Sequence, residues 1–125
     1  MQTSKSYMEA ANAAVPRIFA AEAVTRHANT AAVFVDVRDS AAIAATGTIK
    51  GAQQIPRGML EFMADPATAA HNKALTYDAE VYLVCAAGGQ AALAGKTLLD
   101  MGYTNVTNIG GIGDWVKAGG PVEEA

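Results

Sequence analysis

The stretch VYLVCAAGGQAALAGKTLLDMGY, from Val81 to Tyr103, joins an apolar strand to a helix through a turn of small residues. Its first four residues, Val81 to Val84, are β-branched or apolar with no polar alternation, which is typical of a strand buried on both faces. The helix after the turn ends near Gly102 and has three apolar residues on one face at helical spacing: Ala94, Leu98 and Met101. The only cysteine of the chain, Cys85, lies where the strand gives way to the turn.

The same alternation of strand and helix continues on both sides of this stretch. AAVFVDV, from Ala31 to Val37, predicts a second buried strand, and NVTNI, residues 105–109, predicts a last strand before a short helix whose Trp115 we expect in the core. Short helices are predicted at Ser40–Ala45 and in MLEFMA, residues 59–64. Strands that alternate with helices in this way indicate an α/β fold with a parallel sheet covered on both sides.

The N-terminal residues come before this alternation. SYMEAANAAV has a capping-box pattern and an alanine-rich continuation, which predict a helix that ends at Pro16. The following RIFAAEAVTRHAN predicts a short strand near Ile18 and then a helix to about His27. We therefore divide the chain into a helical extension, residues 1–15, and one domain, residues 16–125.

The composition limits the classes of function to consider. The chain has 125 residues, of which 51% are hydrophobic and 17% charged, and its formal net charge is -3, so it is globular and not basic. Bulk charge gives no reason to expect nucleic acid as a partner. The apolar runs are too short to span a membrane, and the N-terminus lacks the apolar block of a signal peptide. We expect a soluble cytoplasmic protein with no membrane partner.

Two chain segments bring chemically active side chains to the edge of the sheet where the strands end, which is where parallel sheets bind ligands. Asp36 and Arg38 follow one apolar strand, and Cys85 follows the other. A thiolate at that point faces the first exposed amides of a helix, and the N–H groups and the helix dipole stabilise its negative charge. Free cysteine is also among the most buried residue types, so an inert packing role stays open.

The other candidate residues each have a structural alternative. Asp36 either orients the loop through its amides or caps the following helix. Arg38 and Arg57 are the cations nearest the strand edge, and each either binds substrate or forms a structural ion pair. His27 and His71 have no partner at a suggestive spacing, so we expect both at the solvated surface. A single cysteine and two distant histidines predict no metal site.

Four separated motifs resemble, in order and spacing, those of single-domain rhodaneses, and the resemblance runs from Ile18 to Pro121. They are FVDVRDS, GTIKGAQQIPRG, YLVCAAGGQAALAGKTLLDMGYTNV and NIGGIGDWVKAGGP. The resemblance implies a five-stranded parallel sheet with helices on both faces. It also implies a catalytic cysteine that takes up sulfane sulfur as a persulfide and passes it to cyanide or to a thiol, such as thioredoxin or glutathione, without a cofactor. The active loop would be Cys85, Ala86, Ala87, Gly88, Gly89 and Gln90.

This chain departs from the rhodanese pattern in the loop itself. Rhodanese loops commonly follow Cys-Arg-x-Gly-x-Arg-Ser, whereas here Ala86 and Gln90 replace the two arginines and Ala91 replaces the serine. Without those cations we expect weak activity with thiosulfate. Family members also often have a glutamate at the position of Ala42, so that Arg38 would lack a usual partner.

Three functions follow from these observations. The first is a sulfurtransferase with Cys85 as nucleophile, whose donor is a small sulfur compound such as a neutral polysulfide, or a protein persulfide. The second is a catalytically weakened rhodanese-like module for protein interaction or sulfur carriage. The third is a phosphate or arsenate enzyme, but related folds do that chemistry with a loop of Cys, five residues and Arg, and this loop is shorter and lacks the arginine. We favour the sulfurtransferase.

Overall fold

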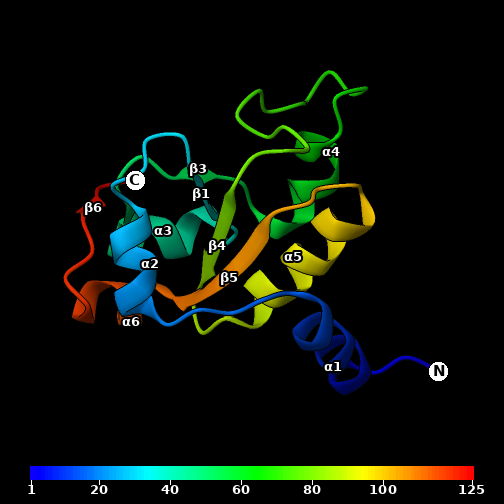
Figure 1. Cartoon of the computed structure of the whole chain (residues 1–125), viewed down its shortest axis with the longest axis horizontal. Coiled ribbons are helices and arrows are strands. Elements are labelled where there is room, and N and C mark those ends of the chain that lie inside the picture. The colour runs from blue at the N-terminus through cyan, green and yellow to red at the C-terminus, as the bar shows by residue number, and fades with distance from the viewer.

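The computed structural model describes all residues, 1–125, and consists of a parallel sheet with helices packed on its two faces (Figure 1). The sheet has the strand order β3-β1-β4-β5, and each neighbouring pair is parallel. Its strands are β1 (Val33–Asp36), β3 (Gln53–Gln54), β4 (Val81–Cys85) and β5 (Val106–Gly111). A separate antiparallel pair is formed by β2 (Thr48–Ile49) and β6 (Val122–Glu123).

Six α-helices and one 3-10 turn connect these strands. They are α1 (Ser4–Ala14), α2 (Ala20–Arg26), α3 (Ser40–Thr46), η1 (Arg57–Met59), α4 (Leu60–Ala64), α5 (Gly89–Asp100) and α6 (Ile112–Lys117). The predicted α/β fold with a parallel sheet is therefore confirmed, and the buried strands at β1 and β4 and the helix after Cys85 lie where the sequence predicts them.

The sheet has four strands, not the five that the resemblance implies. The segment near Ile18 that was expected to be a strand makes only an isolated parallel bridge, between Arg17 and Asn108 of β5. Two backbone hydrogen bonds form it, from Asn108 N to the carbonyl of Pro16 at 2.8 Å and from Ile18 N to the carbonyl of Asn108 at 3.1 Å. Pro16 has no amide to donate, and Phe19 already begins α2 as its N-cap, so no room remains for a longer strand.

The two faces of the sheet bury separate sets of apolar side chains. One set includes Leu83, Cys85 and residues of α4 and α5. The other includes Tyr82, Val84 and Trp115, which is 1% exposed as expected of a core residue. In Figure 1, α5 lies on one side of β4 and β5, and α2 and α6 lie on the other. Alternate residues of β4 thus point to opposite cores, which explains the unbroken apolar run in its sequence.

Helix α1 lies beside α5, the helix that follows Cys85 (Figure 1). Its N-cap is Thr3, three residues before the expected capping residue, and Thr3 and Ser6 form the capping box. Beyond its C-terminus Val15 packs against Gly95 of α5, where a Cβ would lie 2.8 Å from the Val15 Cγ1 atom. The division into an extension, residues 1–15, and a domain, residues 16–125, stays a prediction.

The prediction of two solvated histidines is wrong, because both rings are half-buried. The His27 ring packs edge-on against Phe34 and Trp115, and its Nε2 atom lies 2.7 Å from the carbonyl oxygen of Lys50. The His71 Nε2 atom lies 2.9 Å from the carbonyl oxygen of Leu75. These neighbours come from distant or irregular segments, so periodicity in the sequence could not reveal them.

Candidate active site

Cys85 is the last residue of β4, and its side chain points into the turn that opens α5. The residue is 1% exposed. Its Sγ atom accepts hydrogen bonds from the backbone N–H of Gly88 at 3.0 Å and of Ala91 at 3.3 Å. Two backbone donors and the N-terminus of a 12-residue helix therefore meet at one sulfur atom. Such an arrangement stabilises negative charge on that sulfur.

The shape of the turn depends on glycine. Gly88 is buried and has a φ of 99°, a left-handed conformation that side-chain-bearing residues rarely adopt. Gly111 of β5 packs so closely against the carbonyl of Ala86 that no side chain would fit there. Ala86, Ala87 and Gln90 are exposed, and the Gln90 side chain makes no hydrogen bond. The loop is thus tightly fixed on the β5 side and open to solvent at its tip.

Asn108 of β5, which the sequence analysis missed, holds the turn in place. It is 1% exposed, and its Nδ2 atom donates to the Gly88 carbonyl at 3.0 Å. Its Oδ1 atom accepts from the N–H of Gly110 at 2.8 Å. The backbone of the same residue forms the bridge with Arg17. Asn108 therefore connects the cysteine loop, the end of β5 and the segment before α2.

Asp36 and Arg38, at the end of β1, form a buried ion pair. The Asp36 side chain is 0% exposed and that of Arg38 is 5% exposed, and Arg38 Nη2 lies 2.8 Å from Asp36 Oδ2. The Thr48 hydroxyl also donates to Asp36 Oδ2 at 2.8 Å. Asp36 does not cap the following helix, whose N-cap is Asp39, so that alternative is wrong. Its carboxylate instead binds the backbone and side chain of Arg38.

Arg38 has partners despite the alanine at position 42. Besides the carboxylate of Asp36, its Nη1 atom donates to the Thr46 hydroxyl at 2.9 Å and its Nη2 atom to the Gly47 carbonyl at 2.9 Å. The usual glutamate partner is absent, as the sequence indicates, and the hydroxyl of Thr46 and the carbonyl of Gly47 take its place. No buried side-chain nitrogen or oxygen is left without a hydrogen bond.

Arg57, in η1, lies along the side of α5. Its Nη1 atom binds the Glu61 carboxylate at 2.8 Å and its Nη2 atom binds the Thr97 hydroxyl at 2.9 Å. The hydrogen bond from Arg57 holds the pKa of Glu61 below its usual range. Thr97 belongs to the third turn of α5, whereas the sulfur of Cys85 faces the first. A role of Arg57 in substrate binding stays a prediction.

A second residue that the sequence analysis missed is Arg17, whose guanidinium lies against the loop. A Cβ built on Gly88 would lie 2.7 Å from its Nη1 atom and 2.8 Å from its Nη2 atom, and one on Gly110 would lie 3.1 Å from Nη2. Arg17 is exposed, and its side chain makes no ion pair and no hydrogen bond. Only its place after Pro16, beside a predicted strand, could have suggested that it reaches the sheet edge.

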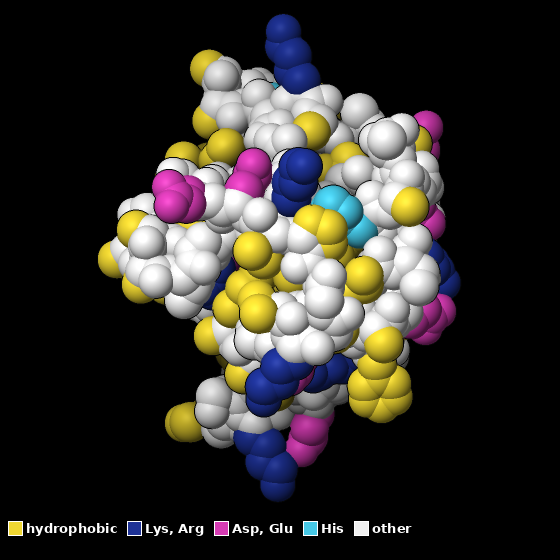
Figure 2. All heavy atoms as spheres, turned by 90° about the vertical axis from the view of Figure 1, so that its left-hand side faces the viewer, with side chains coloured by type: hydrophobic (Ala, Val, Ile, Leu, Met, Phe, Trp, Pro, Cys, Tyr) yellow, Lys and Arg dark blue, Asp and Glu magenta, His cyan; other side chains and the backbone are white.

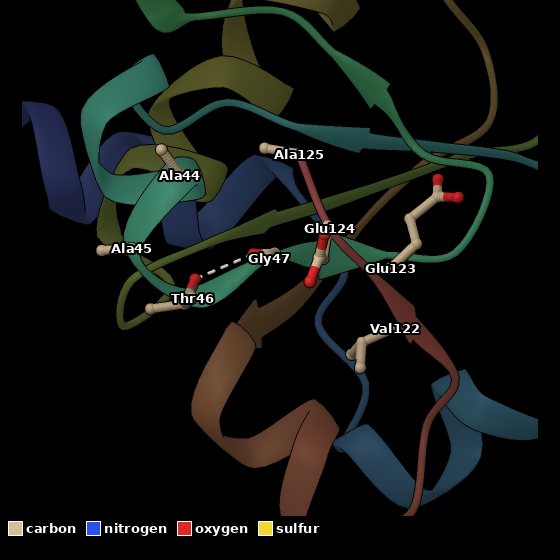
Figure 3. Close-up of a pocket in the computed structure, with 8 residues that line it drawn as sticks. All are labelled: Ala44, Ala45, Thr46, Gly47, Val122, Glu123, Glu124 and Ala125. Atoms are coloured by element: carbon tan, nitrogen blue, oxygen red, sulfur yellow. Dashed lines mark hydrogen bonds between the residues drawn. The ribbon is translucent and has the colours of Figure 1, made fainter.

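The cavities of the molecule lie away from the cysteine loop. Three are present, and none is lined by Cys85 or by the residues of the turn. Figure 3 shows one of them, which lies between the end of α3 and the C-terminal residues and is lined in part by Glu123 and Glu124. A second lies between α1 and α5 and includes Arg57. The exposed part of this site is therefore the tip of the loop, at Ala86, Ala87 and Gln90, and not a cavity.

Neither the charged side chains on the surface nor the potential metal-ligating side chains form a cluster. On the face drawn in Figure 2, acidic and basic side chains are scattered among apolar and neutral ones. No three side chains of the His, Cys, Asp and Glu types are grouped as metal ligands would be. No helix combines the length and apolar character that crossing a bilayer requires.

Comparisons with known proteins place these features in a family. A family model described as the rhodanese-like domain matches residues 20–118. A comparison with curated protein sequences gives no match. Among solved structures, the chain is similar to a protein of unknown function from Rhodopseudomonas palustris CGA009, described as a possible tyrosine phosphatase. The two are 36% identical with a TM-score of 0.92, over 98% of this chain and 96% of that one.

Two further structures are of named sulfurtransferases. The polysulfide-sulfur transferase homodimer from Wolinella succinogenes is 29% identical, with a TM-score of 0.76 over 97% of this chain and 87% of that one. The human single-domain sulfurtransferase is 27% identical, with a TM-score of 0.71 over 82% of this chain and 96% of that one.

Proposed function

The chain belongs to the rhodanese-like domain family, and we propose that it is a sulfurtransferase that carries sulfane sulfur as a persulfide on Cys85. Its similarity to two sulfurtransferases supports this class of function. The observation that carries the proposal is the pair of backbone N–H groups, of Gly88 and Ala91, that donate to the Cys85 sulfur at the start of α5. The amides of the loop are placed to hold an anionic sulfur.

The reaction has two steps, each of which makes and breaks one bond to the transferred sulfur. The Cys85 thiolate attacks the outer sulfur of the donor, and the bond between that sulfur and the rest of the donor breaks, so the electron pair leaves with, for example, sulfite. The product is the anion Cys85–S–S⁻. An acceptor then attacks the outer sulfur, the S–S bond breaks, and the thiolate of Cys85 is restored.

The acceptor must itself be a nucleophile. Cyanide would leave as thiocyanate, and a thiolate would leave as a new persulfide; thioredoxin and glutathione are the thiols we propose. Donor and acceptor between them balance the electrons, so the cycle needs no cofactor and no metal. Because Ala86 and Gln90 carry no charge, we expect turnover with thiosulfate to be low compared with a loop that has two arginines.

Mass spectrometry of the intact protein tests this proposal. We expect the chain to gain one sulfur atom after exposure to thiosulfate, to a polysulfide or to a cysteine persulfide, and to lose it again to cyanide. Cys85→Ser is the matched control and should gain none. A wild-type protein that takes up sulfur from none of the three donors would overturn the proposal. It would favour a non-catalytic module for protein interaction, which suits a cysteine that is only 1% exposed.

The description of the Rhodopseudomonas palustris protein as a possible tyrosine phosphatase makes phosphate chemistry a second candidate. A loop of Cys, five residues and Arg would need arginine at position 91, which is Ala91 here and donates its backbone N–H to the cysteine sulfur. A phosphate also needs more donors and a fixed cation. We therefore expect no hydrolysis of an aryl phosphate, and hydrolysis that disappears in Cys85→Ser would show that the loop has been misjudged.

A further inference from the structure

Arg17 is the only arginine of the chain whose charge is not paired. Each of the other three binds a carboxylate: Arg26 binds Glu22, Arg38 binds Asp36 and Arg57 binds Glu61. Arginine side chains beside carboxylates are largely committed to them. The guanidinium of Arg17 therefore retains all five of its N–H donors for another anion.

The backbone of Arg17 is fixed even though its side chain is exposed. Its two neighbours, Pro16 and Ile18, are both hydrogen-bonded to the backbone of Asn108. The side chain of that same asparagine holds the Gly88 carbonyl. Arg17 and the cysteine loop are thus attached to one buried residue. This arrangement lets an exposed guanidinium stay close to the loop without a carboxylate to hold it.

The distance from this charge to the reacting sulfur is short. The guanidinium covers Gly88, and the N–H of Gly88 donates to the Cys85 sulfur at 3.0 Å. Standard bond lengths then place Nη1 of Arg17 no more than about 9 Å from that sulfur. The sulfur thus lies within about one Debye length of this charge at 0.1 M salt, about 10 Å, so the guanidinium can act electrostatically on an anionic donor at Cys85.

We propose that Arg17 is the anion-binding residue of the Cys85 loop and favours sulfur donors whose leaving group is anionic, of which thiosulfate is the simplest. This inference rests on the proposed sulfurtransferase function and names the substrate class that the site selects. Ala86 and Gln90 leave the loop itself uncharged. A single exposed guanidinium outside the loop supplies the attraction instead, so its effect is moderate and decreases as salt is added.

Alkylation of Cys85 tests the charge without requiring any sulfur transfer. Iodoacetate and iodoacetamide react with a thiolate in the same way, with loss of iodide, but only the first is an anion. Because the chain has one cysteine, the mass of the intact protein reports each rate at a single site. We expect Arg17→Gln to lower the ratio of the iodoacetate rate to the iodoacetamide rate by about three- to tenfold at low ionic strength.

Two control variants make the measurement specific. Arg17→Lys keeps the positive charge and should keep most of the ratio. Lys73→Gln removes another exposed and unpaired cation, from the connection before β4, and should leave the ratio unchanged. Equal ratios in the wild type and Arg17→Gln would overturn the inference, and a loss of thermal stability without a change in the ratio would assign Arg17 a packing role. A sulfur that neither reagent reaches would also overturn it, since thiosulfate is no smaller.

Steady-state formation of thiocyanate from thiosulfate and cyanide extends the test to catalysis. Arg17→Gln should lower kcat/KM for thiosulfate by a similar factor, chiefly through KM, and added salt should remove the difference from the wild type. If the wild type transfers no sulfur while the alkylation ratio still depends on Arg17, the proposed function fails and the anion site stands. If sulfur is transferred equally well with and without Arg17, the proposed sulfurtransferase function stands and the anion site at Arg17 fails.

Discussion

The carboxyl ends of β1 and β4 are neighbours in the sheet, yet the charged groups are paired with each other at one end and unpaired at the other. At the end of β1, Asp36 and Arg38 are buried and neutralise each other, and Thr48 completes their hydrogen bonds. At the end of β4, the loop directs backbone donors at a cysteine, and Arg17 lies above it unpaired. Charges that satisfy one another stabilise the edge of the sheet, whereas donors that are left open are available to a substrate.

The arginines near this edge extend the comparison to three cases. Arg38 is paired and buried, Arg57 is paired and partly exposed, and Arg17 is exposed and unpaired. The same side chain should therefore contribute mainly to stability in the first case, little to stability in the second, and mainly to substrate binding in the third.

The largest effect is expected where the buried pair is broken. Asp36→Asn leaves the Arg38 guanidinium buried without a counter-charge, which should lower the free energy of unfolding by about 3 kcal/mol. Urea denaturation near neutral pH measures it. Cys85→Ser, at the end of the neighbouring strand, should change the same quantity by less than about 1 kcal/mol. Equal losses in the two variants would mean that the two strand ends do not differ in the way described.

The second effect concerns the fit between Arg17 and the loop. Gly88→Ala places a Cβ 2.7 Å from the Arg17 Nη1 atom, at a residue whose φ is positive. We therefore expect the free energy of unfolding to fall by about 2 kcal/mol and the uptake of sulfur to be slower. Thermal unfolding measures the change in stability, and the mass of the intact protein followed over time measures the uptake of sulfur. Gly89→Ala is the matched control, because no atom lies within 4 Å of its Cβ and its φ is not positive. A Gly88→Ala protein as stable and active as Gly89→Ala would contradict the prediction.

The third effect is expected when positive charge is added to the cysteine loop. Gln90→Arg adds a charged donor at the exposed tip of the loop, and kcat/KM for thiosulfate should rise about tenfold, or about 1.4 kcal/mol, with a larger gain when Ala86→Arg is added. Thiocyanate formation at low and high salt measures it, and the gain should shrink at high salt. No gain at low salt would mean that Arg17 already saturates the anion site.

The smallest effect is expected at the exposed pair of Arg57 and Glu61. The depressed pKa of Glu61 means that the folded state favours its ionised form. The pair therefore adds stability above the usual carboxyl pKa, near 4.5, and that stability disappears as pH falls through the lower pKa of the folded state. Because Glu61 is half-exposed, Glu61→Gln should cost no more than about 0.5 kcal/mol near neutral pH. Urea denaturation at several pH values would show the difference vanishing in acid.

The sequence predicted those features that depend on neighbouring residues. The apolar residues of Val33–Asp36, before its final aspartate, and of Val81–Cys85 mark strands buried on both faces, and the small residues after Cys85 mark the turn into α5. The position of Cys85 at the sheet edge follows from these local patterns alone. The resemblance added the family and the chemistry.

Features that depend on the packing of distant segments were missed. Nothing in the sequence shows that Asn108 links the loop to Arg17, because the three positions are far apart in the chain. The hydrogen bond from Thr48 to Asp36 likewise joins two strands that do not pair. The segment 16–18, which makes an isolated bridge through two hydrogen bonds, resembles a strand in composition, and only the missing amide of proline and the early start of α2 distinguish it from one.

The guanidinium that covers Gly88 belongs to a residue outside the part of the chain that the family model matches, which begins at residue 20. Two relatives can therefore share every residue of the loop from Cys85 to Gln90 and still present different electric fields to a donor. An alignment restricted to the loop would rank them as equivalent. Donor preference in such proteins can thus diverge through changes in the segment just before the residues that the family model matches, while the nucleophile and its amides stay the same.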